Sequence, residues 1–210
     1  MRKIHRCFSS LVATALMLTW LSGWPVASTA QLASTTPTAV GNASAVRATV
    51  LGFLGTATTT TLADTGSLGG ATDARDTSQL TGSIPSLLSG EVLSATTIGY
   101  PNEVDSAASL AGLNLNVAGV SVSADFVMAQ ASQVLGAPGN GTSNIDNLSI
   151  NGMPIHVTGT PNQTVAIPGG QLVINEQTIS TDGATVVNAL HVIVNDVADV
   201  VIASATAGVR

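Results

Sequence analysis

The stretch that decides the fold is "NLSINGMPIHV", residues 147–157. Its Asn151-Gly152 pair is the combination that type I′ turns favour, because both central residues of that turn need a positive φ. A two-residue turn at this point pairs Ile150 with Met153, and it brings five apolar side chains to one face: Leu148, Ile150, Met153, Ile155 and Val157. The stretch therefore predicts a β-hairpin.

A second hairpin is predicted directly after it, in "VTGTPNQTVAIPGGQLVINEQ", residues 157–177. With Gly169-Gly170 as the turn, Ile167 pairs with Leu172 and Val165 with Ile174, so one face is again apolar. Pro168 has no N–H to donate, so we expect the strand that contains it to lie at a sheet edge.

Outward from the hairpins, most of the chain alternates apolar and polar residues as half-buried strands do. Strands are expected in 47–64, 91–99, 113–134 and 184–209, the last divided at Asn195-Asp196. Residues 65–90 read as a long loop with a possible short helix at 84–88, and 135–144 as a second loop. No repeat of 20 to 50 residues is visible. The sequence therefore predicts a single all-β domain over 46–210, an antiparallel β-sandwich.

The first thirty residues have the pattern of a signal peptide. Arg2, Lys3 and Arg6 precede an apolar run over 8–21, and small residues follow at Ser28 and Ala30. We expect cleavage between Ala30 and Gln31, a flexible mature N-terminus over 31–45, and a secreted or cell-surface location. An uncleaved membrane anchor is the alternative, although this run is shorter than the ~20 residues of a spanning helix and no comparable run follows.

The composition after residue 30 excludes several classes of partner. That part of the chain has no lysine, cysteine or tryptophan, and three arginines against twelve acidic residues give it a formal charge of −9. Such a balance argues against binding nucleic acid or an anionic membrane surface. The absent cysteine excludes disulfides and thiolate chemistry there. With Phe53, Tyr100 and Phe126 as the only aromatic residues, Val, Ile, Leu and Ala must fill the core.

Catalytic and metal sites have little support in the sequence. His156 and His191 could join a metal site or a Ser-His-Asp triad, but neither an HExxH nor a GxSxG motif is present. The first hairpin also places His156 on its polar face. The aspartates do not form the alternating run typical of calcium loops. We therefore expect no cofactor and no catalytic residue, with a loop-bound calcium ion as an open alternative.

The best candidate for a partner-binding surface is the polar side of the two hairpins. It carries Asn162, Gln163, Asn175 and His156. A second candidate, the threonine run "TATTTT" at 56–61, could bind a regular surface, although exposed threonine is also ordinary in strands.

Several motifs together resemble one family of secreted bacterial proteins. "PNQTVAIPGG", "INEQ" and "VNALHV" follow the Asn-Gly hairpin in that order. The chain resembles the choice-of-anchor P family over about 45–209, most strongly over 144–207. The resemblance implies export and a β-rich extracellular module, and it carries over no catalytic residue. The final "SATAGVR" departs from the family pattern because it has no sorting motif, so the resemblance leaves surface anchorage in doubt.

These observations favour a non-enzymatic extracellular structural or adhesive protein that associates with itself or with an envelope polymer. A carbohydrate- or polymer-binding module that uses the polar hairpin surface is the second hypothesis. A hydrolase centred on His156 or His191 is the third.

Overall fold

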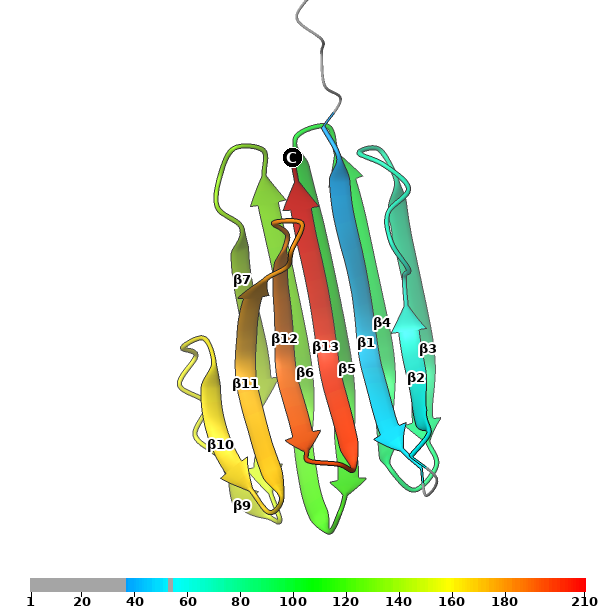
Figure 1. The fold of residues 1–210 in the computed structure, drawn as a ribbon, viewed down its shortest axis with the longest axis vertical. Coiled ribbons are helices and arrows are strands. Elements are labelled where there is room, and N and C mark those ends of the chain that lie inside the picture. Colours follow the sequence, from blue (N-terminus) through cyan, green and yellow to red (C-terminus); the bar gives the residue numbers. More distant parts are fainter. Residues whose placement is uncertain (1–36, 53–54) are drawn as a thin grey trace, which may run out of the picture. The chain divides into compact units, whose positions relative to one another are not determined.

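The computed structural model describes residues 37–52 and 55–210, which form two antiparallel β-sheets packed face to face (Figure 1). This confirms the predicted all-β sandwich. Sheet A has the strand order β10-β11-β12-β13-β1-β2. Its strands are β1 (Ala39–Leu51), β2 (Ala57–Asp64), β10 (Gln163–Ile167), β11 (Gly170–Ile179), β12 (Thr185–Val194) and β13 (Ala198–Val209).

Sheet B has the order β3-β4-β5-β6-β8-β9, and β7 also pairs with β6. Its strands are β3 (Ala74–Ile84), β4 (Leu88–Tyr100), β5 (Glu103–Val117), β6 (Val120–Val134), β7 (Asn140–Asp146), β8 (Ser149–Ile150) and β9 (Met153–Pro154). The predicted signal peptide lies outside the described residues.

Small aliphatic side chains fill the space between the sheets, as the composition requires. Leu110, Leu172 and Ile202 are fully buried, together with many alanines and valines. The two aromatic residues that the structure describes lie outside this core, since Tyr100 is exposed and Phe126 is half-buried. Two partly buried hydrogen bonds join the sheets: Gln177 Nε2 of β11 donates to the Gly141 carbonyl of β7 at 2.9 Å, and Ser106 Oγ of β5 donates to the Thr206 carbonyl of β13 at 2.7 Å. Because that bond uses the only proton of Ser106, the Thr97 hydroxyl donates in the neighbouring 2.7 Å contact.

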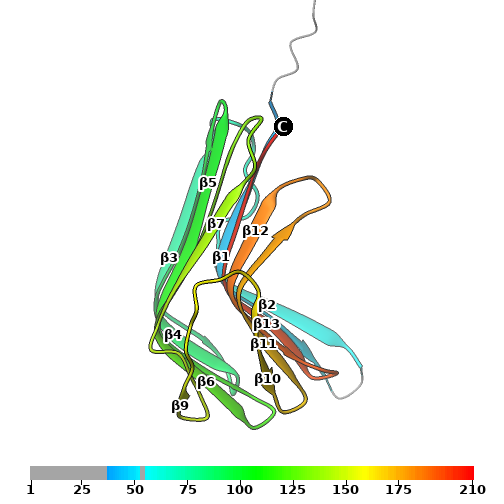
Figure 2. The ribbon, with the colours of Figure 1, turned by 90° about the vertical axis from the view of Figure 1, so that its left-hand side faces the viewer.

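Both sheets are bent sharply about halfway along their strands, and in the same sense (Figure 2). In sheet A the bend follows a row of residues, one on each strand except β10, whose cross-strand pairing is interrupted. The ladder between β1 and β13, for example, stops at Ser44–Ser204 and resumes at Val46–Ile202. We name the row crease A, and it consists of Asn175, Ala189, Ala203, Ala45 and Ala63.

Left-handed backbone accompanies this interruption on every second strand of crease A. Asn175, Ala203 and Ala63 have φ values of 52°, 53° and 46°. The inward-facing alternation shifts by one residue at the row, so that Ala45 and Val46 are both in the core. Small side chains suit such a row, because a non-glycine residue in this conformation brings Cβ close to the following carbonyl oxygen.

Sheet B has a matching row, crease B, which consists of Leu80, Val92, Gly112, Asp125 and Asn147. Val92, Gly112 and Asn147 have positive φ, and the β4–β5 ladder has register shifts on both sides of Glu91. Asn147 Nδ2 donates to Asp125 Oδ2 at 2.7 Å, which ties the segment between β7 and β8 to β6 at the crease.

The first predicted hairpin is confirmed. Ile150 pairs with Met153, and Ile155 N donates to the Leu148 carbonyl at 2.8 Å. Asn151 and Gly152 both have positive φ, as a type I′ turn requires. The predicted break at Asn195-Asp196 is also confirmed, because β12 ends at Val194 and β13 begins at Ala198.

The second hairpin exists, but its predicted turn is wrong by one residue. Pro168-Gly169 forms the turn, so Ile167 pairs with Gly170 and Val165 with Leu172. Proline cannot take the positive φ of a type I′ turn, whereas proline followed by a positive-φ glycine suits type II. A side chain at Gly170 would also clash with the Ile193 carbonyl oxygen. The shift moves every pair by two positions, so the predicted apolar face is unchanged.

Three segments expected to be irregular contain strands. Residues 39–45, expected to be flexible, form the first half of β1 in the middle of sheet A. Residues 74–84, placed in a loop, form β3, and residues 140–144 belong to β7. No helix forms at 84–88, because residues 85–87 are the turn between β3 and β4. These strands are rich in Gly, Ala, Ser and Thr, and β3 is an exposed edge strand, so none shows the apolar alternation on which the prediction depended.

Replacing Val92 with glycine should stabilise the protein. Val92 is exposed and β-branched at φ 48°, a conformation that costs a residue of this kind about 1 kcal/mol and glycine little. Urea denaturation of Val92→Gly should show a higher midpoint than the parent protein. Val134→Gly, at an exposed valine without positive φ, should show a lower one. A lower midpoint for Val92→Gly would contradict the strain assigned to crease B.

Candidate functional site

Two of the residues predicted to bind a partner, Gln163 and Asn162, hold the segment 155–162 against its neighbours. Gln163 Nε2 donates to the His156 carbonyl at 2.7 Å, and its Oε1 accepts from Thr158 N at 2.8 Å and from the Thr158 hydroxyl at 2.9 Å. Asn162 Oδ1 accepts from Gln177 N at 2.9 Å, and Asn162 N donates to the Asn175 carbonyl at 2.9 Å. The polar atoms of both side chains are therefore engaged within the chain.

The prediction that Asn175 lies on the polar surface of the hairpins is wrong. Asn175 is buried inside β11 and belongs to crease A. Its Nδ2 donates to the Gly159 carbonyl at 3.1 Å, and its Oδ1 accepts from Gln177 Nε2 at 3.0 Å. Asparagine tolerates left-handed backbone better than most residues, which suits it to this position. Of the four predicted residues, His156 and Asn162 are exposed and Gln163 is half-buried.

A polar cluster spans crease A on the outer face of sheet A. His191 Nδ1 lies 2.8 Å from Glu176 Oε2, and His191 Nε2 lies 3.2 Å from Asp199 Oδ1. Asn188 Nδ2 donates to Glu176 Oε2 at 2.6 Å. Glu176 and Asn188 lie on one side of the crease and His191 on the other. The imidazole therefore joins the two halves of the bent sheet.

The cluster shifts the pKa values of its two main members in opposite directions. The hydrogen bond to Glu176 raises the pKa of His191, and this outweighs the opposing effect of burial. The hydrogen bond from His191 lowers the pKa of Glu176 against its own desolvation, with Asn188 and the charge of Arg47 acting in the same direction. Both shifts favour the ionised pair. Asp199, the third charged neighbour, also raises the pKa of His191.

The histidines do not assemble a metal centre in this part of the chain. His191 is held by β11 and β13 partners, whereas His156 lies in the exposed segment that Gln163 fastens. Within residues 37–52 and 55–210, no group of three or more His, Cys, Asp or Glu side chains is placed to hold a metal ion.

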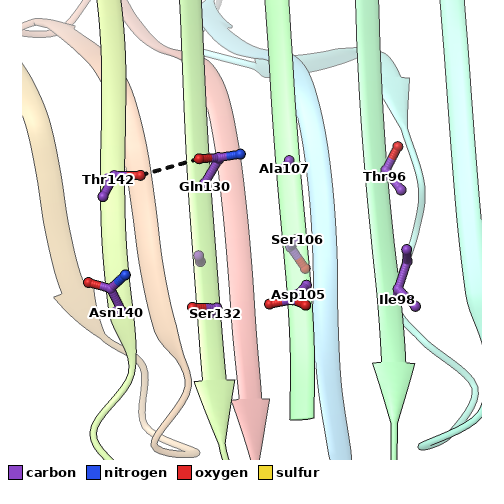
Figure 3. A pocket seen from close by; sticks show the side chains of 10 residues that line it. Thr96, Ile98, Asp105, Ser106, Ala107, Gln130, Ser132, Asn140 and Thr142 are labelled. Atoms are coloured by element: carbon purple, nitrogen blue, oxygen red, sulfur yellow. Dashed lines mark hydrogen bonds between the residues drawn. The ribbon is translucent and has the colours of Figure 1, made fainter.

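A hollow with a volume of about 390 Å³ lies on the outer face of sheet B. Two rows of side chains, each crossing β4, β5, β6 and β7, line it (Figure 3). One row is Thr96, Ala107, Gln130 and Thr142, and the other is Ile98, Asp105, Ser132 and Asn140. The small Ala107 side chain lies between longer neighbours, which leaves the surface open above it.

The chemistry of this hollow is that of hydroxyl and amide groups around one carboxylate. Gln130 is engaged only loosely, by a 3.5 Å contact with the Thr142 hydroxyl. Asp105 and Asn140 lie one strand away on either side of Ser132. Neighbouring strands are about 4.8 Å apart, so the rows present hydrogen-bonding groups at regular intervals.

The two lateral edges of the sandwich differ. At one edge, β10 has five residues between Pro161 and Pro168, β9 has two residues including Pro154, and β7 has seven residues and follows Pro138. At the other edge, β2 has eight residues and β3 has eleven, and neither strand contains proline or lysine. Figure 1 shows β2 and β3 together along this side. We call them the open edge.

Sequence reasoning identified His191 but neither its partner Glu176 nor the hollow on sheet B. Both depend on which residues face each other across strands, and the sequence fixes that register only near a recognisable turn. The open edge was missed for a different reason, because β3 was expected to be a loop.

Comparison of the chain with protein-family models, curated proteins and solved structures finds no match. Within the part of the chain that the structure describes, no helix is both long enough and apolar enough to cross a membrane. The described residues form a bent antiparallel β-sandwich with the open edge at β2 and β3 and a polar hollow on the outer face of sheet B.

The His191–Glu176 pair should make the free energy of unfolding depend on pH. Because folding raises the pKa of His191, its contribution is complete below its ordinary value of 6.5 and is lost as the pH rises through the raised pKa. Because folding lowers the pKa of Glu176, its contribution is present above 4.5 and is lost as the pH falls through the lowered pKa. The contribution of this pair to the free energy of unfolding should therefore be greatest between pH 4.5 and pH 6.5.

Urea denaturation at several pH values tests this expectation. The variant His191→Gln should lose on the order of 1 kcal/mol near pH 5.5 and less at alkaline pH, where His191 is neutral in the parent protein. His156→Gln, which replaces an exposed histidine outside the cluster, is the matched control. Parallel pH profiles for the parent and His191→Gln would contradict the role of the pair.

Proposed function

We propose that this protein is a secreted, non-enzymatic structural protein of the cell surface or extracellular matrix that acts by association of its copies. The observation that carries the proposal is the open edge formed by β2 and β3. A strand edge offers unpaired N–H and C=O groups, and natural sheets normally protect such edges with proline, lysine, bulges or short strands.

The contrast between the edges supports this proposal. Prolines bracket or interrupt β9 and β10, and these strands are short. The open edge has longer strands, and its charged residues lie only near strand ends, at Arg75 and Asp76 in β3 and Asp64 in β2. An edge of this kind suits the addition of a strand from another molecule.

Sequence features support the proposed location. The leader pattern over residues 1–30 favours export, and the resemblance to the choice-of-anchor P family favours an extracellular module. An acidic surface with few charges overall fits a protein that meets other copies rather than nucleic acid.

Charging the open edge should prevent association. A double variant, Ser78→Lys with Thr59→Lys, places one lysine on each strand of that edge, and lysine there opposes strand addition. Sedimentation velocity over a concentration series should show association of the parent protein and monomers of the variant.

Thr164→Lys is the control, because it adds the same charge to β10 at the opposite edge and should still associate. A parent protein that stays monomeric at every concentration would contradict the proposed function.

A second candidate function is binding of a neutral polysaccharide, which the hollow on sheet B favours. Its rows offer hydroxyl, amide and carboxylate groups to a chain of sugar hydroxyls, and Ile98 and Ala107 offer apolar contact to the C–H face of a sugar ring. The carboxylate of Asp105 and the negative charge of the chain disfavour an anionic polymer.

Filling the hollow should abolish this binding. Affinity electrophoresis through gels that contain a β-glucan, an α-glucan, a mannan or polygalacturonate should show retardation of the parent protein by at least one neutral polymer. Ala107→Phe should lose it, while Ala166→Phe on exposed β10 should retain it. Equal retardation of both variants, or none of the parent protein, would rule out this site.

A further inference from the structure

Leu80 is the most exposed large apolar residue that the structure describes, with 80 % of its surface accessible. It lies in the middle of β3 on the open edge, beside Val92 of β4, which is 58 % exposed. Both residues belong to crease B. The apolar spot is therefore centred on the line where sheet B bends.

The charges of β3 restrict how another strand could pair with it. Arg75 and Asp76 lie at its beginning, and residues 77–84 are uncharged. In an antiparallel pair of two β3 strands, a two-fold axis at Asp76 would place two carboxylates opposite each other, which is destabilising. An axis farther along the strand avoids this repulsion.

The bend restricts the register further. A sheet that continues from one molecule into the next keeps its hydrogen bonds only if the two bends coincide. A two-fold axis perpendicular to sheet B exchanges the two halves of the bent sheet and leaves the bend in place, provided that the axis passes through the crease. On β3 the crease residue is Leu80, which lies opposite Val92 between the Gln79–Leu93 and Thr81–Glu91 pairs.

We propose that two copies of this protein pair antiparallel along β3 about a two-fold axis at Leu80. The inference rests on the proposed function and specifies its interface. Leu80 then faces Leu80 of the second copy, Gln79 faces Thr81, and Asp76 faces Ile84. The contact is self-complementary, as two-fold interfaces are, and it covers the apolar spot on both molecules.

Disulfide trapping tests this register, because the chain has a single cysteine, Cys7. In a Cys7→Ser background, Leu80→Cys places two thiols directly opposite each other, within the 4.4–6.8 Å Cα separation that disulfides use. Mild oxidation should convert it to a covalent dimer on a non-reducing gel.

Gln79→Cys and Thr81→Cys are matched controls at exposed neighbours of Leu80. Each variant alone should crosslink poorly. The same residue in the two copies is then a diagonal pair across the two strands, about 7–8 Å apart, which is too far for a disulfide. An equimolar mixture of the two should crosslink rapidly, since residue 79 of one copy faces residue 81 of the other.

The outcomes separate this inference from the proposed function. If the parent protein associates but Leu80→Cys crosslinks no faster than Gln79→Cys alone, the register is wrong and the proposed function stands. If the parent protein does not associate at all, both are overturned. Rapid crosslinking of Leu80→Cys and of the 79/81 mixture, with slow crosslinking of each control alone, supports the pairing.

Discussion

The nested bend of the two sheets is the constraint on which the rest of the structure depends. The long strands β1, β2, β3, β4, β5, β6, β11, β12 and β13 each cross a crease, and on alternate strands of crease A the crease residue is left-handed. Because the interrupted pairs lie in line, the sheet bends along a row and keeps its ladder on both sides of it. Sheet B must bend at the same height for the layers to remain in contact, and Val92 adopts a strained conformation there.

The bend also explains the composition of the chain. Alanines occupy four of the five positions of crease A. A bulky residue there would be strained in the left-handed backbone conformation or would clash with the opposite sheet. The fifth position is Asn175, whose amide holds Gly159 and Gln177 in place. On the outer face the His191–Glu176 pair joins the two halves of the bent sheet A. Polar residues that resemble a binding site in the sequence thus stabilise a change in strand direction.

The sequence predicted those parts of the fold in which local chemistry and periodicity agree. Asn151-Gly152 predicted the register of one hairpin, and the alternation over 113–134 predicted the end of β5 and the whole of β6. It could not predict β3, because an edge strand with little buried surface has no apolar alternation. It misplaced the second turn because two adjacent turn pairs compete at Pro168-Gly169-Gly170. The hollow, the open edge and the role of Asn175 all require cross-strand register over long strands, which no local pattern supplies.

The pairing of the first and last strands has a mechanical consequence. Ala39 of β1 lies opposite Val209 of β13, and Thr38 and Arg210 exchange backbone hydrogen bonds, so both ends of the described domain leave from one end of sheet A. Tension applied between those ends acts perpendicular to the two strands, so it loads the hydrogen bonds of the β1–β13 ladder one after another. A force transmitted between copies through β3 would act on sheet B instead. It would not load the hydrogen bonds between Thr38 and Arg210.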